Sequence, residues 1–173
     1  MLIGAFADSH DHLDHLRAAV AIFNRSKCRT VLFAGDLVST FAVPCLRELQ
    51  CPLVGCFGDN EGNKVGLDAG LSILGKLAEP PFGYRAPDGT RFLVAHMLRQ
   101  LRDCGGGCDD DDFHIAVYAH THRAKIHYDE RGRLYVNPGE TCGWKFREPS
   151  VALIDTEERQ ARILRLDSDM VNL

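Results

Sequence analysis

The chain has 173 residues, of which 45% are hydrophobic and 25% charged, and its 24 acidic and 20 basic residues give a formal net charge of −4. These proportions are those of a folded soluble domain, and they exclude intrinsic disorder, collagen-like repeats and long coiled coils. A slightly acidic chain is not expected to bind nucleic acid by bulk attraction to phosphates, although a bound metal ion can still attract a phosphate-containing substrate.

Five apolar runs of strand length recur along the chain. They cover residues 2–7, 30–34, 53–57, 92–95 and 115–119. Continuous apolar runs are typical of strands that are buried on both faces, as in a sheet covered by helices. Each run is followed directly, or after one glycine, by an acid or a histidine: Asp8, Asp36, Asp59, His96 and His120.

Helical patterns separate the early strands. Apolar residues at helical spacing predict a helix over residues 13–23. Pro44 suits the first turn of a short helix that continues through residues 45–49. Leucines at helical spacing over residues 67–77 predict a third helix, which ends before Pro80.

The later part of the chain favours hairpins. Turn residues at 87–89 and 131–132 each separate two strand-like segments, and a polar turn separates residues 151–154 from 161–164. Neither a linker nor a repeat interrupts this order, so we expect one domain over residues 1–173. Residues 105–112, with three glycines and four aspartates, are interpreted as a solvated loop.

The cysteines and the absence of long apolar runs bear on the compartment. Seven cysteines occur, with no C-x-x-C pair, which favours free thiols in a reducing cytoplasm. Cys104 and Cys108 lack the second pair that a structural zinc site needs. The apolar start of the chain ends at Asp8, too early for a signal peptide, and no run approaches the roughly 18 residues of a membrane helix.

Polar side chains at the ends of several strands form the main functional signal. In an open parallel sheet, ligands bind beyond the carboxyl ends of the strands. Two close pairs, D-x-H and H-x-H, place side chains two residues apart, which point the same way along an extended segment. An isolated Asp or His at such a position is usually a cap or a surface residue, but repetition favours a common site. Its members are Asp8, His10, Asp36, Asp59, His96, His120 and His122.

The ligand types in this set indicate a metal centre. Imidazole and carboxylate groups together favour divalent Mn, Fe, Ni or Zn, with Mn or Ni our preferred expectation. Seven ligands exceed the need of one tetrahedral ion. They suit two ions about 3.5–4 Å apart that share a bridging carboxylate.

The ordered motifs resemble those of the calcineurin-like metallophosphoesterases, and in particular their small bacterial and archaeal phosphodiesterases. The matching segments are Asp8-Ser9-His10, Gly35-Asp36, Gly58-Asp59-Asn60-Glu61, His96, Ala119-His120-Thr121-His122 and Asn137-Pro138-Gly139. The resemblance spans residues 1–155 and implies a four-layer α/β/β/α sandwich, in which two mixed sheets are flanked by helices.

The resemblance also implies a role for each matching residue. Asp8, His10 and His122 would hold one metal; Asp59, His96 and His120 would hold the other; and Asp36 would bridge both. Asp36, Asn60 and His120 would serve catalysis, in which a metal-bridging hydroxide attacks phosphorus. Asn60, Lys145 and Arg147 are candidate contacts for substrate phosphate. Trp144 is a core residue or a pocket wall, whereas His12 and His15 are interpreted as solvent-facing positions.

Two departures from the family pattern bear on the reaction. Asp59 stands where the family usually has Asn, and Asn60 stands where its larger phosphatases carry a His. Both favour a phosphodiesterase acting on a small phosphoester. A homo-oligomer is compatible with the sequence. The alternatives are a phosphomonoesterase acting on nucleotides or phosphoproteins, and a non-catalytic protein-interaction scaffold like the retromer subunit of this fold. The complete set of histidines argues against the scaffold.

Overall fold

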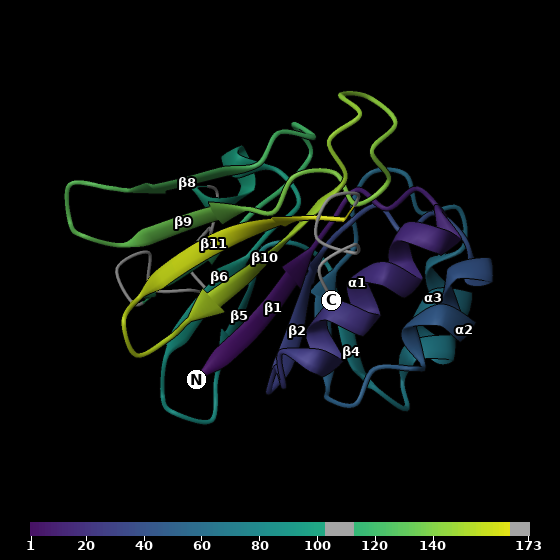
Figure 1. The fold of residues 1–173 in the computed structure, drawn as a ribbon, viewed down its shortest axis with the longest axis horizontal. Helices are drawn as coiled ribbons and strands as arrows, with labels where there is room; N and C mark the ends of the chain where they lie inside the picture. The colour runs from purple at the N-terminus through teal and green to yellow at the C-terminus, as the bar shows by residue number, and fades with distance from the viewer. Residues whose placement is uncertain (103–112, 167–173) are drawn as a thin grey trace.

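The computed structural model describes residues 1–102 and 113–166, which form an α/β fold (Figure 1). The predicted loop at residues 105–112 and the cysteines Cys104 and Cys108 lie outside these ranges. The strands are β1 Leu2–Phe6, β2 Thr30–Ala34, β3 Leu53–Cys56, β4 Gly75–Ala78, β5 Phe82–Arg85, β6 Arg91–Val94, β7 Ile115–Val117, β8 Lys125–Tyr128, β9 Leu134–Asn137, β10 Ser150–Asp155 and β11 Gln160–Arg165. The helices are α1 Leu13–Arg25, α2 Val43–Leu46 and α3 Lys64–Leu71, with short 3-10 helices η1 Thr40–Ala42 and η2 Leu98–Leu101.

The strands make two mixed sheets. The first has the order β11-β10-β1-β2-β3-β4. Strands β1 to β4 pair in parallel, whereas β10 is antiparallel to both of its neighbours, β1 and β11. The second has the order β5-β6-β7-β9-β8, with parallel pairs at its centre and an antiparallel pair at each edge. The predicted mixed-sheet sandwich and its three late hairpins are therefore confirmed.

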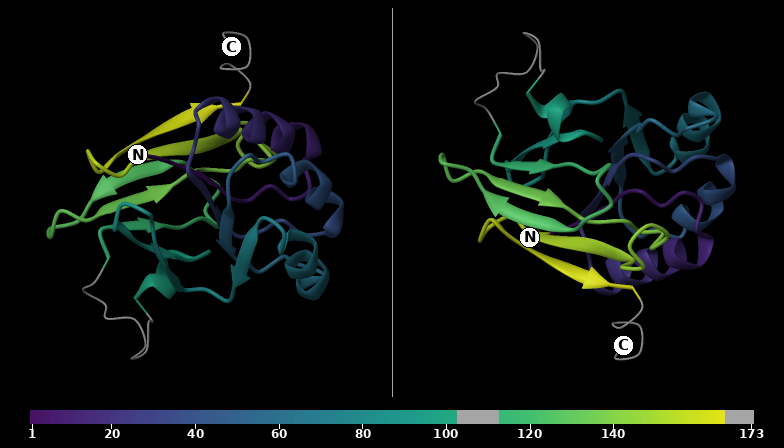
Figure 2. Two further views of the ribbon diagram at one scale, coloured as in Figure 1. Left: turned by 90° about the horizontal axis from the view of Figure 1, so that it is seen from below. Right: turned by 90° about the horizontal axis from the view of Figure 1, so that it is seen from above.

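Alternating side chains of the first sheet build two cores. Phe6 faces the helices and packs in one core with Leu16 and Phe23 of α1. Ile3 and Ala5, on the opposite face of β1, pack in the second core between the two sheets. The helices cover the outer face of the first sheet, as the views along and across the layers show (Figures 1 and 2). Among the described residues, no helix has the length and apolarity needed to cross a membrane.

The outer face of the second sheet has a thinner cover. Within the described ranges, η2 contributes Leu101 to a small third core with Leu93, Phe113 and Ala116. The predicted fourth layer is thus represented there by a single short turn of helix.

The helix predicted over residues 67–77 is shorter than expected. α3 ends at Leu71, and residues Gly75–Ala78 form the parallel edge strand β4 instead. Leu77 pairs with Gly55 of β3, so its side chain is buried by its position in the sheet and not on the face of a helix. The leucine spacing is helical through Leu77, but pairing with the neighbouring β3 strand decides the structure of residues 75–78.

Candidate metal centre

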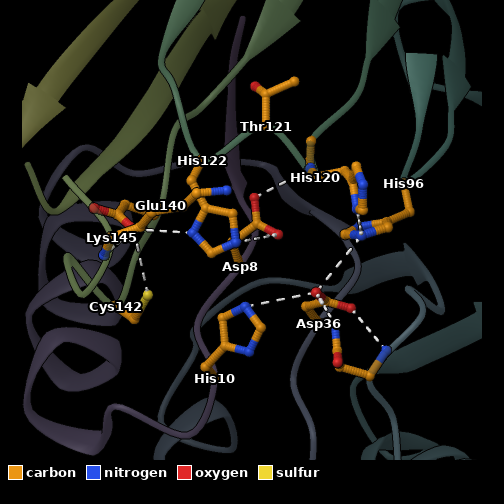
Figure 3. A network of polar contacts seen from close by, with 12 residues as sticks. Asp8, His10, Asp36, His96, His120, Thr121, His122, Glu140, Cys142 and Lys145 are labelled. Atoms are coloured by element: carbon orange, nitrogen blue, oxygen red, sulfur yellow. Dashed lines mark hydrogen bonds and ion pairs between the residues drawn. The ribbon is translucent and has the colours of Figure 1, made fainter.

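The turns that follow five parallel strands meet at one edge of the sandwich. They bring together all seven side chains predicted as metal ligands, several of which are shown in Figure 3. Hydrogen bonds between side chains and backbone join the two sheets here, because the His96 Nδ1 atom lies 2.8 Å from the Ala34 carbonyl oxygen and the His120 amide donates to Asp8 Oδ2 over 3.2 Å. The ends of both sheets therefore form a single site.

Strained backbone marks this edge. The residues Asp8, His10, Asp36, His120 and His122 all have positive φ, between 40° and 68°. Positive φ is uncommon for residues other than glycine and costs of order 1–3 kcal/mol each, so it persists only where the surroundings enforce it. Part of that enforcement is a shared acceptor, since the amides of Ser9 and His10 both donate to the Asp36 carbonyl over 3.1 Å.

Glu61 ties two of the turns together, a role that the sequence reasoning missed. Its carboxylate accepts hydrogen bonds from the Asp36 amide at 2.7 Å and from the Gly58 amide at 2.8 Å. A Cβ atom on Gly58 would collide with the Asp36 side chain, so this close approach needs glycine. The only sequence signal for Glu61 was its place at the end of the Gly58–Glu61 motif.

The first group of candidate ligands is Asp8, His10 and His122, whose ligand atoms all lie within 4.8 Å of one another. Asp8 Oδ1 and His10 Nε2 are buried and, in the part of the chain that the structure describes, have no hydrogen-bond partner. Unsatisfied buried polar atoms are rare and carry a desolvation penalty. A cation bound between them would satisfy both atoms.

The second group is Asp59, His96 and His120, also within 4.8 Å of one another. Asp59 Oδ1 lies 2.8 Å from His96 Nε2 and 3.4 Å from His120 Nδ1. Because His96 Nδ1 donates to the Ala34 carbonyl, its Nε2 atom is the one that faces the site. Orientation of a ligand imidazole by a backbone carbonyl is common at metal centres.

Asp36 lies between the two groups. Its Oδ2 atom is 3.5 Å from His10 Nε2 and 3.6 Å from His96 Nε2. Asn60 donates its side-chain amide to the same oxygen over 2.8 Å, and its backbone amide donates to Oδ1 over 3.1 Å. Asp36 therefore has the geometry of a bridge, and Asn60 holds its carboxylate in place.

The electrostatics of the cluster favour a bound cation. Burial, helped by the negative charge of Asp36, raises the pKa of Asp8 to about 8. Burial likewise lowers the pKa of His10. Burial opposes ionisation of Asp59, but the neighbouring His96 and His120 lower its pKa overall. Carboxylate and imidazole groups brought together in this way fit divalent cations in the chemistry of their donor atoms.

A buried carboxylate outside the predicted set orients His122. Glu140 is fully buried, and His122 Nδ1 donates to its Oε2 over 2.9 Å, so His122 Nε2 is left to face Asp8 (Figure 3). Glu140 also accepts from the backbone amides of Lys145 at 2.9 Å and Phe146 at 2.6 Å. These bonds lower its pKa although burial opposes them. Its position directly after Asn137-Pro138-Gly139 was the only signal in the sequence.

The remaining predicted residues, Lys145 and Arg147, are the candidate contacts for substrate phosphate. The Lys145 and Arg147 side chains are exposed on the segment after β9, and Lys145 Nζ lies 5.6 Å from the centre of the Phe146 ring.

The interpretation of His15 as solvent-facing is wrong, because its Nδ1 lies 3.1 Å from the Thr141 carbonyl oxygen and 3.0 Å from that of Cys142. This long-range contact could not be read from a local helical pattern.

Comparison with known proteins gives consistent matches over almost the whole chain. Residues 1–159 match the model of the calcineurin-like phosphoesterase superfamily domain. Phosphodiesterase MJ0936 of Methanocaldococcus jannaschii is 29% identical over 172 residues, covering 96% of this chain and all of that protein. The solved structure of an archaeal phosphodiesterase has a TM-score of 0.84 at 26% identity, covering 95% of this chain and 99% of that one. The E. coli phosphoesterase YfcE shares the fold, with a TM-score of 0.64 at 14% identity over 96% of this chain and all of that chain.

Proposed function

The chain belongs to the calcineurin-like phosphoesterase superfamily, and from this premise we propose that it is a two-metal phosphodiesterase that acts on a small phosphodiester. One observation carries the proposal. Two groups of Asp and His ligands meet around Asp36, and the buried atoms Asp8 Oδ1 and His10 Nε2 have no hydrogen-bond partner among the described residues. The similarity to an archaeal phosphodiesterase along the full length supports the same reaction.

The proposal assigns each metal its own set of ligands. Asp8, His10 and His122 would hold the first ion, Asp59, His96 and His120 would hold the second, and Asp36 would be shared between them. Two bound divalent cations would lower the pKa of a water nucleophile and neutralise charge on the phosphoryl oxygens. The mixed imidazole and carboxylate donors support Mn or Ni, with Fe and Zn as further candidates.

The chain's own residues bind and orient the substrate. His120 and Asn60 are exposed at the centre of the cluster, so their N–H groups can donate to a phosphoryl oxygen. Asn60 has a second task, since it holds the Asp36 carboxylate in its bridging position. Lys145 and Arg147 supply positive charge at the rim. Together with Asp36, His120 and Asn60 form the proposed catalytic set.

The charge of the site supports a diester rather than a monoester. Asp59 adds a third carboxylate to Asp8 and Asp36, and its side chain is 45% exposed toward the incoming substrate. A phosphodiester carries one negative charge, whereas a monoester carries up to two, so Asp59 repels the diester less.

We propose that residues 1–173 form one domain, and the cysteine usage of the chain supports a place in the cytoplasm.

The test combines metal analysis with hydrolysis. Purified protein is dialysed, its bound metals are counted by elemental analysis, and cleavage of bis(p-nitrophenyl) phosphate is followed with added Mn²⁺, Ni²⁺, Fe²⁺ or Zn²⁺. We expect up to two ions per chain and metal-dependent release of p-nitrophenolate. The proposal fails if no divalent metal gives turnover above background.

A further inference from the structure

An exposed tryptophan stands beside the metal centre. Trp144 is the only tryptophan of the chain, and 64% of its surface is exposed. Its ring centre lies 6.3 Å from that of His10, at an interplanar angle of 26°, and 6.0 Å from that of His12. The His10 ring in turn stacks on His122 at 5.2 Å. Trp144 therefore extends the aromatic side of the first ligand group toward solvent.

The backbone on both sides of Trp144 is anchored to the site. The amides of Thr141 and Cys142 donate to the carbonyl oxygens of Ala7 at 3.0 Å and Asp8 at 3.1 Å. After the tryptophan, the amides of Lys145 and Phe146 donate to the buried Glu140 carboxylate. Figure 3 shows Glu140, Cys142 and Lys145 grouped beside His122. The backbone that carries the indole is thus fixed relative to the candidate ligands.

The solvent-facing indole is poorly explained by folding alone. A large aromatic ring gains stability when it is removed from water, and Trp144 leaves most of its surface outside. Exposed aromatic rings beside a phosphate site are suited to stacking on a nucleobase, because every base has a π-face. The nearby cations Lys145 and Arg147 match the negative charge of a phosphodiester and not a purely apolar ligand.

We propose that Trp144 is a specificity residue, which stacks on the base of a nucleoside phosphodiester while the phosphate lies on the metal cluster. The indole lies directly beside the His10 ring, so a base stacked on it would be adjacent to the first ligand group. A single aromatic ring of this kind selects a small nucleoside ester rather than a long nucleic acid, in keeping with the net charge of −4. The inference rests on the proposed function, because it assumes that the phosphate binds at the cluster.

Binding can be measured without turnover by comparing two phosphate ligands that differ only in the base. Protein loaded with two equivalents of Zn²⁺ is titrated with adenosine 5′-monophosphate or with ribose 5-phosphate by isothermal titration calorimetry. Base stacking should make the adenosine ligand bind roughly 5- to 100-fold more tightly. Because Trp144 is the only tryptophan, its fluorescence should be quenched by the adenosine ligand and not by ribose 5-phosphate.

Three variants assign the effect to the ring. Trp144→Ala should abolish the difference between the two ligands and leave the affinity for ribose 5-phosphate unchanged, whereas Trp144→Phe should retain part of the difference. Tyr128→Ala is the matched control, since Tyr128 is 51% exposed and contacts Arg159 at the opposite end of the sheets.

The outcomes separate this inference from the proposed function. Equal binding of the two ligands by the unmodified protein, or an undiminished preference in Trp144→Ala, overturns the stacking role, even if bis(p-nitrophenyl) phosphate is still cleaved. Loss of cleavage with every divalent metal would instead overturn the proposed function itself.

Discussion

Asp36 lies between the two groups of candidate metal ligands. Its Oδ2 atom lies at similar distances from His10 and His96, which belong to different groups. Its other oxygen accepts backbone hydrogen bonds from Asp59 and Asn60, so the carboxylate cannot turn freely. A change at this carboxylate should therefore affect two sites at once.

Asp36→Asn is expected to weaken both bound metals, whereas His10→Ala should mainly empty the first site. The physical reason is that a neutral amide gives up the negative charge that both cations share. Metal per chain after dialysis measures the outcome, and circular dichroism checks that each variant is folded. If Asp36→Asn keeps two tightly bound ions and a near-normal rate, the bridging assignment is wrong.

Asp59 is the residue that should tune the choice between monoester and diester. Its side chain is about half exposed and contacts the two histidines of the second group. Replacement by Asn, the usual residue in the family, leaves shape almost unchanged and removes one negative charge.

We expect Asp59→Asn to raise the ratio of monoester to diester hydrolysis at saturating metal, because a dianion gains more than a monoanion from the lost repulsion. Rates with p-nitrophenyl phosphate and bis(p-nitrophenyl) phosphate give the ratio. The variant should also need more free metal for full activity, since an amide oxygen binds a cation less strongly than a carboxylate. An unchanged ratio would mean that the charge of Asp59 does not act on the bound substrate.

At the scale of elements, the segment between β9 and β10 does more than connect two strands. It carries Glu140, which orients His122, and Trp144, which flanks His10. Gly143, at φ +67°, could not take a Cβ without contact with the ring of Pro149. The buried Glu140 carboxylate is the common acceptor that joins this segment to the metal ligands.

Glu140→Gln is expected to lower the free energy of unfolding of the metal-free protein by about 1–3 kcal/mol, because buried charge-assisted hydrogen bonds are lost. The affinity of the first metal should fall by roughly 10- to 100-fold, as for other residues that orient a metal-bound histidine. Urea unfolding and metal titration measure the two effects.

Glu148→Gln is the control on the same segment. Glu148 is 63% exposed and pairs with Arg165 at the surface, so its replacement should change stability by less than about 1 kcal/mol. Equal losses in the two variants would contradict the special role of Glu140.

At the scale of the whole molecule, stability depends on two cores that share the first sheet. The core between helices and sheet includes the Cys28 thiol, which is only 6% exposed. Burial, with a smaller contribution from Cys51, raises the pKa of Cys28 from 9.0 to about 12. The folded state therefore keeps this thiol protonated over a range in which the unfolded chain has lost the proton.

This shift predicts alkaline destabilisation. Above pH 9 the unfolded state binds fewer protons than the folded state, so the stability contributed by the neutral thiol should be lost as pH rises toward about 12. Cys28→Ala should be less stable than the unmodified protein at pH 8, because it loses buried atoms, and the gap should narrow at pH 10 and 11. Urea unfolding under reducing conditions measures it, and a constant gap would refute the prediction.

Local patterns in the sequence were enough to predict the strands that carry the site and the residue types placed after them. Apolar runs that end at Asp8, Asp36 or His96 are local patterns. Because parallel strands present their carboxyl ends at one edge of a sheet, these patterns predicted that the side chains meet at a single site. The mixed sandwich itself followed from the ordered motifs and their family resemblance.

Only the tertiary structure decided which contacts complete that site. Residues 75–78 form the strand β4 because β3 offers backbone partners, although the leucine spacing over residues 67–77 predicts a helix. Glu61, Glu140 and His15 act through hydrogen bonds to groups that are distant in the sequence or lie in another turn, and no local pattern specifies such partners. Periodicity reports which face of an element is apolar, whereas a buried polar group is defined by the partner that folding brings to it.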